Sequence, residues 1–432
     1  MNMRNQVFFL PWAGLKKEMK IILVFVILVV LIGGIVLVFQ LLQPRQEKKQ
    51  ESNQRIQEQT ILQGEEQTKG TKSNNVMTLS TKVPADYKNF ADHYIALSSL
   101  DITTGEKTEL VRWAACEATV ALSPDKNEIA YFINPNDRCE REYYEGGDIG
   151  HTELWVSDIS GSNKHLAAQW VWKFTTPKWS RDGRYVAYDK VIEHPYPQGR
   201  EHILLIYDIQ KKTEQSLGSF FGIVHEIIGF SQDNELVYYD GSQFLYKVSI
   251  STQGREKIYT HESGFDQSFV ISPDSSSIVV FKTEDWYRGK TTPLKTKIGA
   301  IETSTGKYRE LYDGTDPLTY FSFSNERGPV FLPDNFHVVY GASKEQSGKT
   351  GLWIIDIATG ERKELDGTSS STLHGITPVA LSADGDLVLY TGWASETTYY
   401  YTISLSTGAV TNIESTRTAT PYSGERFLDW LN

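Results

Sequence analysis

Acidic side chains recur along the chain at similar places in a repeated pattern, and they are the first candidates for chemistry. Asp125, Asp182 and Asp384 each stand two residues after a serine and shortly before an apolar stretch. Two such carboxylates held close together could act as the acid and base of glycan hydrolysis. An aspartate at this place in a turn also bonds the backbone two residues further on. Turn geometry therefore explains these residues without catalysis.

One segment concentrates groups that could ligate a metal: Glu140, Glu142, Glu145, Asp148 and His151. Carboxylate oxygens suit a hard cation such as Ca²⁺. Their spacing matches no fixed ligand pattern, so a solvated acidic loop is the simpler interpretation. We therefore predict no metal site and no bound cofactor.

Other catalytic signatures are missing from the sequence. It contains no G-x-S-x-G pentapeptide of an α/β-hydrolase, no glycine-rich phosphate loop and no clustered Cys and His for a metal. The sequence therefore favours a protein that is not an enzyme. A hydrolase or lyase that acts on glycans through carboxylates is the alternative.

The elements that carry the aspartates form a repeat, whose clearest copy runs from Pro177 to Tyr188. Asp182 and Gly183 close a tight turn, because the glycine accepts a positive φ. The apolar residues after the turn do not alternate with polar ones, as in a strand that is covered on both sides. The spacing of the copies, roughly 40 to 60 residues, is near that of propeller blades. Their aspartates are Asp125, Asp182, Asp233, Asp274, Asp334 and Asp384.

A second phrase lies between the copies of the first: an apolar strand followed by a turn rich in Thr and Gly, as in residues 352–360 and 403–408. The two phrases together make a four-stranded meander, which must stack on its neighbours around an axis. The strand with the Thr-Gly turn occurs seven times and the aspartate hairpin six times, so one blade lacks an inner strand. Residues 426–431 supply an apolar strand for that place. We predict an all-β propeller of seven four-stranded blades that pairs the two chain ends. Six blades with a separate N-terminal hairpin is the alternative.

The Ser-Pro-Asp-Gly hairpin followed by the Asp-Ile-x-Thr-Gly turn resembles the repeat of TolB-like β-propellers, which are related in architecture to the WD-repeat proteins. The resemblance covers the chain from about residue 76 to its end. It implies a propeller that serves as a docking platform or as an accessory domain of a peptidase. The fifth copy departs from the pattern, since Leu332 replaces the serine and Asn335 the glycine.

The lengths of the connections suggest that the two faces of the propeller differ. Turns after the first and third strands of each blade are short, whereas several connections after the second and fourth strands are long. Long loops on a rigid scaffold often carry function, and Tyr and Trp are favoured as interface anchors. We therefore expect a binding surface for a protein or an envelope polymer on the long-loop face. Its candidate residues are Tyr143, Tyr144, Tyr196, Trp286, Tyr287 and Trp393.

The N-terminal part has a different composition. Residues 1–20 are expected to form a short cytoplasmic tail, residues 21–43 a transmembrane helix and residues 44–75 a flexible polar linker before the propeller of residues 76–432. Ile21 to Phe39 contains no polar side chain and is long enough to cross a bilayer. It exceeds the apolar region of a signal peptide and is followed by no small-residue cleavage site. We expect an uncleaved single-pass anchor in the plasma membrane, with the propeller outside.

Charge and cysteine content add two expectations. The net charge of −11 argues against non-specific nucleic-acid binding, and we expect a monomer. The two cysteines, Cys116 and Cys139, flank one predicted hairpin, and both flanks return to the same face. In an oxidising compartment we expect them to form a disulfide. Together these features predict a membrane-tethered, extracytoplasmic propeller that acts as a binding platform.

Overall fold

The computed structural model describes residues 75–82, 94–113, 118–133, 152–169, 171, 176–193, 200–221, 225–241, 243–263, 265–284, 295–314, 328–343, 349–365, 367–368, 370–394, 397–417 and 425–430. All of these residues belong to one compact unit, Lys72–Asn432. They form 28 strands in seven four-stranded antiparallel sheets, here called blades A to G in chain order.

The first four blades contain β1 to β15 together with the C-terminal strand β28, which belongs to blade A. Blade A holds β28 (Glu425–Trp430), β1 (Asn75–Lys82), β2 (Tyr94–Asp101) and β3 (Lys107–Trp113). Blade B holds β4 (Ala118–Leu122), β5 (Glu128–Ile133), β6 (Glu153–Asp158) and β7 (His165–Gln169). Blade C holds β8 (Lys178–Trp179), β9 (Tyr185–Glu193), β10 (Arg200–Asp208) and β11 (Thr213–Phe221). Blade D holds β12 (His225–Phe230), β13 (Leu236–Gly241), β14 (Phe244–Ser249) and β15 (Arg255–Thr260).

The last three blades contain β16 to β27. Blade E holds β16 (Phe265–Ile271), β17 (Ser277–Glu284), β18 (Thr296–Glu302) and β19 (Tyr308–Gly314). Blade F holds β20 (Val330–Phe331), β21 (His337–Ser343), β22 (Thr350–Asp356) and β23 (Arg362–Glu364). Blade G holds β24 (His374–Leu381), β25 (Leu387–Ala394), β26 (Thr397–Ser404) and β27 (Val410–Arg417).

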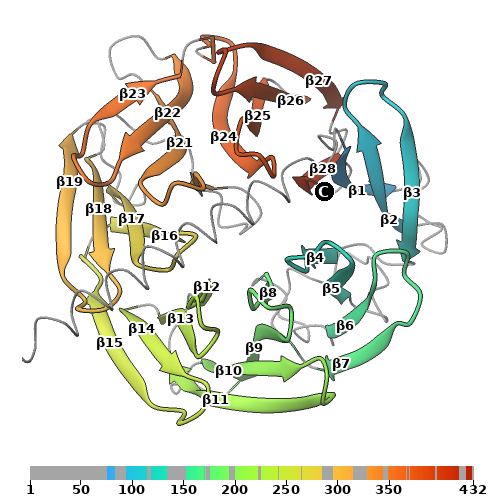
Figure 1. Cartoon of the computed structure of the whole chain (residues 1–432), viewed down its shortest axis with the longest axis vertical. Coiled ribbons are helices and arrows are strands. Elements are labelled where there is room, and N and C mark those ends of the chain that lie inside the picture. Colours follow the sequence, from blue (N-terminus) through green and yellow to red (C-terminus); the bar gives the residue numbers. More distant parts are fainter. Residues whose placement is uncertain are drawn as a thin grey trace, which may run out of the picture. The chain divides into compact units, whose positions relative to one another are not determined.

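The seven blades surround a common centre (Figure 1), and the predicted seven-bladed all-β propeller is confirmed. The first strand of a blade lies near the centre and the fourth strand lies at the rim, as β12 and β15 show in blade D. Seven clusters of buried apolar side chains lie between the sheets of the described chain, one at each seam between neighbouring blades. The core is therefore a ring of seams and not a single centre.

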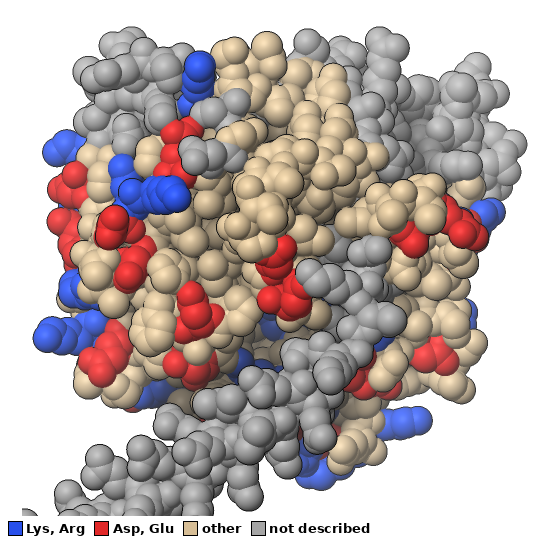
Figure 2. Space-filling model, turned by 45° about the horizontal axis from the view of Figure 1, so that its top comes forward, with Lys and Arg blue, Asp and Glu red and all other residues tan. Residues whose placement is uncertain are grey.

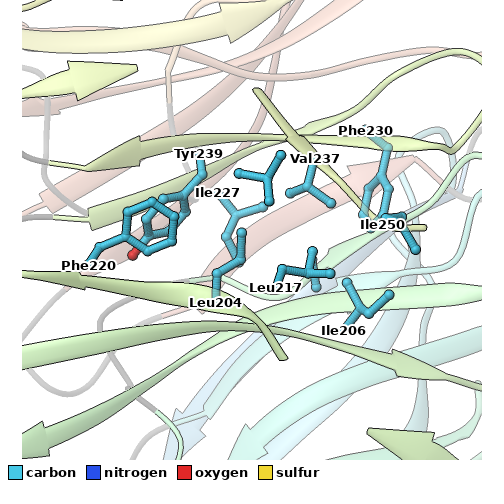
Figure 3. Close-up of a cluster of buried hydrophobic side chains, with 11 residues drawn as sticks. Leu204, Ile206, Leu217, Phe220, Ile227, Phe230, Val237, Tyr239 and Ile250 are labelled. Atoms are coloured by element: carbon cyan, nitrogen blue, oxygen red, sulfur yellow. The ribbon is translucent and has the colours of Figure 1, made fainter. Parts of the chain in front are cut away.

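The second strand of each blade explains why the blades must stack. In β9, Val186, Ala187 and Tyr188 are all fully buried, although neighbouring residues of a strand point to opposite faces. Val186 and Tyr188 pack in the seam with blade B, whereas Ala187 packs in the seam with blade D. Figure 3 shows the C–D seam, which β10, β11, β12 and β13 fill with aliphatic and aromatic side chains. A strand that is apolar on both faces needs a blade on each side.

The ring closes through the C-terminal strand. β28 pairs antiparallel with β1 and takes the innermost place in blade A, as the sequence predicted for residues 426–431. The register places Val76 opposite Trp430 and Leu79 opposite Arg426. An apolar cluster between blades G and A completes the set of seams.

The Ser-x-Asp motif forms the hairpin between the first two strands of a blade. In blade C, the Ser180 hydroxyl donates to Oδ1 of Asp182 at 2.6 Å, and Oδ1 accepts the backbone N–H of Arg184 at 3.1 Å. The Ser180 hydroxyl oxygen accepts the N–H of Tyr185 at 2.8 Å, and Gly183 has φ of +71°. Ser123, Ser231, Ser272 and Ser382 make the same bonds to the aspartates that follow them. The side chains of these aspartates therefore accept hydrogen bonds within the turns, as predicted.

Blade F forms the same turn with different residues. Leu332 has no hydroxyl to donate, and Asp334 instead lies 2.6 Å from Nδ1 of His337 while accepting the backbone N–H groups of Phe336 and His337. Asn335 adopts φ of +65° in the place of the glycine, which asparagine tolerates better than other residues. The departure from the motif therefore leaves the hairpin intact.

Strand order places the connections on two faces. The turn face carries the hairpins and the Thr-Gly turns, such as those between Leu122 and Glu128 and between Asp356 and Arg362. The loop face carries the other connections, and the longest of these run from Ile133 to Glu153 and from Gly314 to Val330. The described residues contain no helix that could cross a membrane. The predicted helix of residues 21–43, with the tail and linker around it, lies outside the described residues.

Candidate functional site

Most of the residues predicted for binding lie outside the described residues: Tyr143, Tyr144, Tyr196, Trp286 and Tyr287. The connections that contain these residues follow the second strands β5, β9 and β17, which end on the loop face. The backbone of Trp393 is described, near the loop-face end of β25 and opposite His374. Cys116 and Cys139 also lie outside the described part of the chain.

A different group of residues draws attention in blades C and D. The second strands β9 and β13 each carry an aspartate directly after a buried tyrosine, namely Asp189 and Asp240. The corresponding places in blades B and E hold Phe132 and Phe281. Both aspartates are buried, and burying a carboxylate is costly unless it is paired.

Asp189 pairs with a histidine inside the C–D seam. Its Oδ2 lies 2.7 Å from Nδ1 of His202 in β10, and both side chains are completely buried. The Tyr239 hydroxyl of blade D reaches the same oxygen at 3.5 Å. Figure 3 shows Tyr239 beside Phe220 at one end of the apolar cluster. Burial raises the pKa of Asp189, and the contact with His202 opposes that rise.

Asp240 belongs to a second group, which we call the acid–histidine cluster: Glu226, Asp240 and His261. Nε2 of His261 lies 2.8 Å from Oδ1 of Asp240. The His261 ring packs at centroid distances of 5.5 Å from Phe269 and 6.1 Å from Tyr259, in the D–E seam. Glu226 in β12 stands directly opposite Asp240 in β13. Directly opposed residues of antiparallel strands share a face, with Cβ atoms about 5 Å apart.

The environment shifts both carboxyl groups of this cluster toward the protonated form. Burial raises the pKa of Glu226 from 4.5 to about 7; the positive charge of Lys178 opposes this shift and the charge of Asp240 adds to it. Burial also raises the pKa of Asp240, against the contact with His261. Glu226 is only partly buried, and it lies on the innermost strand of its blade. A carboxyl group with this pKa can give or take a proton near neutral pH.

A lysine–glutamate cluster of Glu262, Lys282 and Lys297 lies further along the D–E seam. Glu262 accepts from Lys282 at 3.0 Å and from Lys297 at 2.8 Å, and the bond from Lys297 is the main reason that its pKa is lowered. Lys282 is buried, with its ammonium group 4.4 Å from the centre of the Tyr308 ring. One carboxylate thus bonds both ammonium groups, so we assign this cluster to the stability of the seam.

The described residues contain no group of three His, Cys, Asp or Glu side chains that could hold a metal ion. On the side of the molecule that Figure 2 shows, acidic and basic side chains are interspersed, with no broad area of one sign. The acid–histidine cluster is a candidate for proton chemistry at the loop-face end of blade D.

The sequence contained a signal for these residues that the repeat analysis did not use. Asp189 and Asp240 each follow directly on a run of buried apolar residues, and a charge at such a place needs a partner. The partners themselves could not be predicted, because Glu226 and His261 come from the beginning of β12 and from the connection after β15.

No protein-family model and no curated protein matches the sequence. Solved structures are similar in fold. TolB from Acinetobacter baumannii is 17% identical over 82% of this chain and 83% of its own, with a TM-score of 0.42. A structure of prolyl endopeptidases is 13% identical over 81% of this chain and 50% of its own, with a TM-score of 0.51.

The β-propeller domain of the Trilobed protease from Pyrococcus furiosus, described as having an open velcro topology, is 13% identical over 80% of this chain and 95% of its own, with a TM-score of 0.48. At these identities the similarity concerns the fold and not the function. The class of the protein follows from its own sheets: it is a β-propeller of seven four-stranded blades. These sheets confirm the predicted propeller, and TolB is among the solved structures with a similar fold.

Proposed function

We propose that the protein is a membrane-tethered, extracytoplasmic β-propeller whose loop face binds a protein or a polymer of the cell envelope. The observation that carries this proposal is the difference between the two faces. The turn face consists of tight hairpins whose polar groups are used within the turns, as the bonds of Ser180 and Asp182 show. The long connections all leave from the loop face.

The fold favours binding through a preformed surface over a function that requires a large conformational change. Every blade is fixed to two neighbours by a buried seam, so the loop face stands on a rigid support. The expected anchors are Trp286 and Tyr287, together with the tyrosines of the other long connections. The partner is expected to meet exposed aromatic rings at the centre of the contact, since such rings are frequent hot spots.

Binding to isolated cell-envelope polymer and to envelope proteins tests this proposal. The full chain, purified in detergent, is mixed with the insoluble polymer and sedimented, and is also crosslinked to proteins in intact cells. The double variant Trp286→Ala/Tyr287→Ala should lose at least about tenfold in apparent affinity, which is a typical loss for one or two hot-spot residues.

The matched control is Phe336→Ala, which removes an aromatic ring that is 57% exposed on the turn face. It should bind like the wild type. Equal binding by all three proteins, or a loss caused only by Phe336→Ala, would place the interaction elsewhere and overturn the proposal.

A second candidate function, a glycan hydrolase or lyase, is favoured by one observation. The acid–histidine cluster brings a carboxyl group of raised pKa next to another carboxyl group, which contacts a histidine. Reducing ends, or the ultraviolet absorption of an unsaturated sugar, would reveal turnover of acidic and neutral polysaccharides by the full chain. Glu226→Gln should then lower turnover by about a hundredfold or more. Wild-type protein without turnover on any polysaccharide would exclude this candidate.

A further inference from the structure

The acid–histidine cluster places two carboxyl groups close together, which is unfavourable when both are charged. Glu226 and Asp240 are directly opposed in the β12–β13 pair, and like charges in directly opposed positions destabilise a sheet. The pair lies at the loop-face end of blade D, where β12 begins and β13 ends. Asp240 is buried in the D–E seam, so water does not screen its charge as it would on a surface.

The charged groups around the two carboxyl groups compensate them only in part. Lys178 of blade C attracts Glu226, and His261 contacts Asp240. The contact with His261 is close, but neither Oδ1 of Asp240 nor Nε2 of His261 makes a well-aligned hydrogen bond. Three further charged groups of the seam, Glu262, Lys282 and Lys297, bond to one another.

We propose that the loop-face end of blade D is a pH-sensitive latch, in which Glu226 must carry a proton for the β12–β13 pair to pack fully against blades C and E. With the proton in place, the opposed carboxyl groups carry at most one negative charge, which the charge of Lys178 and the contact of Asp240 with His261 stabilise. Without the proton, two opposed carboxylates repel each other, and the end of the strand pair opens. The latch does not depend on what the loop face binds.

The direction of the pH dependence follows from the two protonation states. The pKa of Glu226 is about 7 in the folded protein, against an ordinary value of 4.5. Between these values the closed state binds more protons than the open state, so stability falls as the pH rises. Below about 4.5 both states are protonated and above about 7 neither is, so the dependence disappears at both ends. A carboxyl group whose pKa is raised by burial therefore makes stability fall as the pH rises, whereas a salt-bridged carboxylate with a lowered pKa makes it rise.

Hydrogen exchange of the full chain tests the latch directly. After correction for the intrinsic pH dependence of exchange, the opening constant of amides in β12 and β13 should rise by up to about tenfold per pH unit between 4.5 and 7. Glu226→Gln imitates the protonated carboxyl group, and its opening constant should stay at the low-pH value. The matched control, Glu235→Gln, removes the same charge from the exposed turn face of blade D and should behave like the wild type.

Two results would overturn the latch: a wild-type opening constant that does not change with pH, or a pH dependence that Glu226→Gln leaves in place. If Glu226→Gln does not fold, Asp240→Asn removes the repulsion from the other strand and should weaken the pH dependence of the opening constant, whereas the part caused by burial of Glu226 remains. A ¹³C titration of the wild-type glutamate carboxyl groups gives an independent result. A glutamate midpoint near 7 that moves down in Asp240→Asn supports the latch, and the absence of any glutamate titrating above pH 6 contradicts it.

Discussion

At the scale of single residues, the buried Asp189–His202 pair shows how a charge can be kept inside a propeller. Both side chains are fully buried, 2.7 Å apart, in a seam that is otherwise apolar. Breaking such a pair by removing one partner costs more than the pair contributes when intact, because the remaining charge stays buried. The pair therefore makes the C–D seam sensitive to single substitutions.

We predict that His202→Ala lowers the free energy of unfolding by about 3–5 kcal/mol. Urea unfolding of the full chain, followed by tryptophan fluorescence, measures the change. The control is Arg112→Ala, which breaks the exposed pair with Glu109 on the rim and should change the free energy of unfolding much less, because water screens an exposed pair. Similar losses in both variants would show that the buried pair has no special role.

The cysteines provide the second prediction at this scale. Cys116 precedes β4 and Cys139 follows β5, and the two strands pair with Ala118 opposite Ile133, so the flanks of the hairpin start side by side. We expect a disulfide that stabilises the domain by about 3 kcal/mol through the loop that it closes. Mass spectrometry of protein from an oxidising compartment should show no alkylatable thiol before reduction. Two free thiols would contradict both the bond and the extracytoplasmic location.

At the scale of elements, the strands could be predicted where their residues form a local pattern. The Ser-x-Asp hairpin and the second strand after it are defined within about ten residues, because turn chemistry and two-sided burial act locally. The first strands were harder to delimit, since β8 and β20 comprise only Lys178–Trp179 and Val330–Phe331. The acid–histidine cluster could not be predicted, because register and the neighbouring blade bring Glu226, Asp240 and His261 together.

The most consequential element is β28. It covers the edge of β1, and through this pairing the two ends of the described chain hold the ring closed. We predict that removal of residues 426–432 lowers the melting temperature of the whole domain by several degrees or more, because it exposes an unpaired strand edge and opens a seam.

Removal of Leu431 and Asn432 alone is the control, since it leaves Glu425–Trp430 intact. Differential scanning calorimetry of the three chains compares their stabilities. An unchanged transition in the longer truncation would mean that ring closure contributes nothing to stability.

At the scale of the whole molecule, the ring distributes stability over seven similar seams. No blade can bury both of its faces alone, so the domain should unfold as a unit and not blade by blade. The same arrangement presents the loop face as one surface at the ends of several blades. Function of the kind proposed here depends on which side of a membrane that surface faces.

The membrane anchor is the last prediction. Ile21 to Phe39 is a continuous stretch without a polar side chain, and about 20 such residues span a bilayer core of about 30 Å at 1.5 Å per residue. We expect the full chain to stay in the membrane pellet after carbonate extraction, and a chain that starts at Val76 to be soluble and folded.

A substitution within the stretch makes the test specific. Val30→Lys places a charge near the middle of the apolar segment, at a cost of about 2.5–3.5 kcal/mol for insertion. This variant should appear partly in the soluble fraction at unchanged mass. Protease added to intact spheroplasts should digest the propeller and leave a small membrane-bound fragment if the domain lies outside. A wild-type chain that is soluble at full length would refute the anchor, whereas a protected propeller would refute only its orientation, and with it the oxidising environment that the disulfide requires.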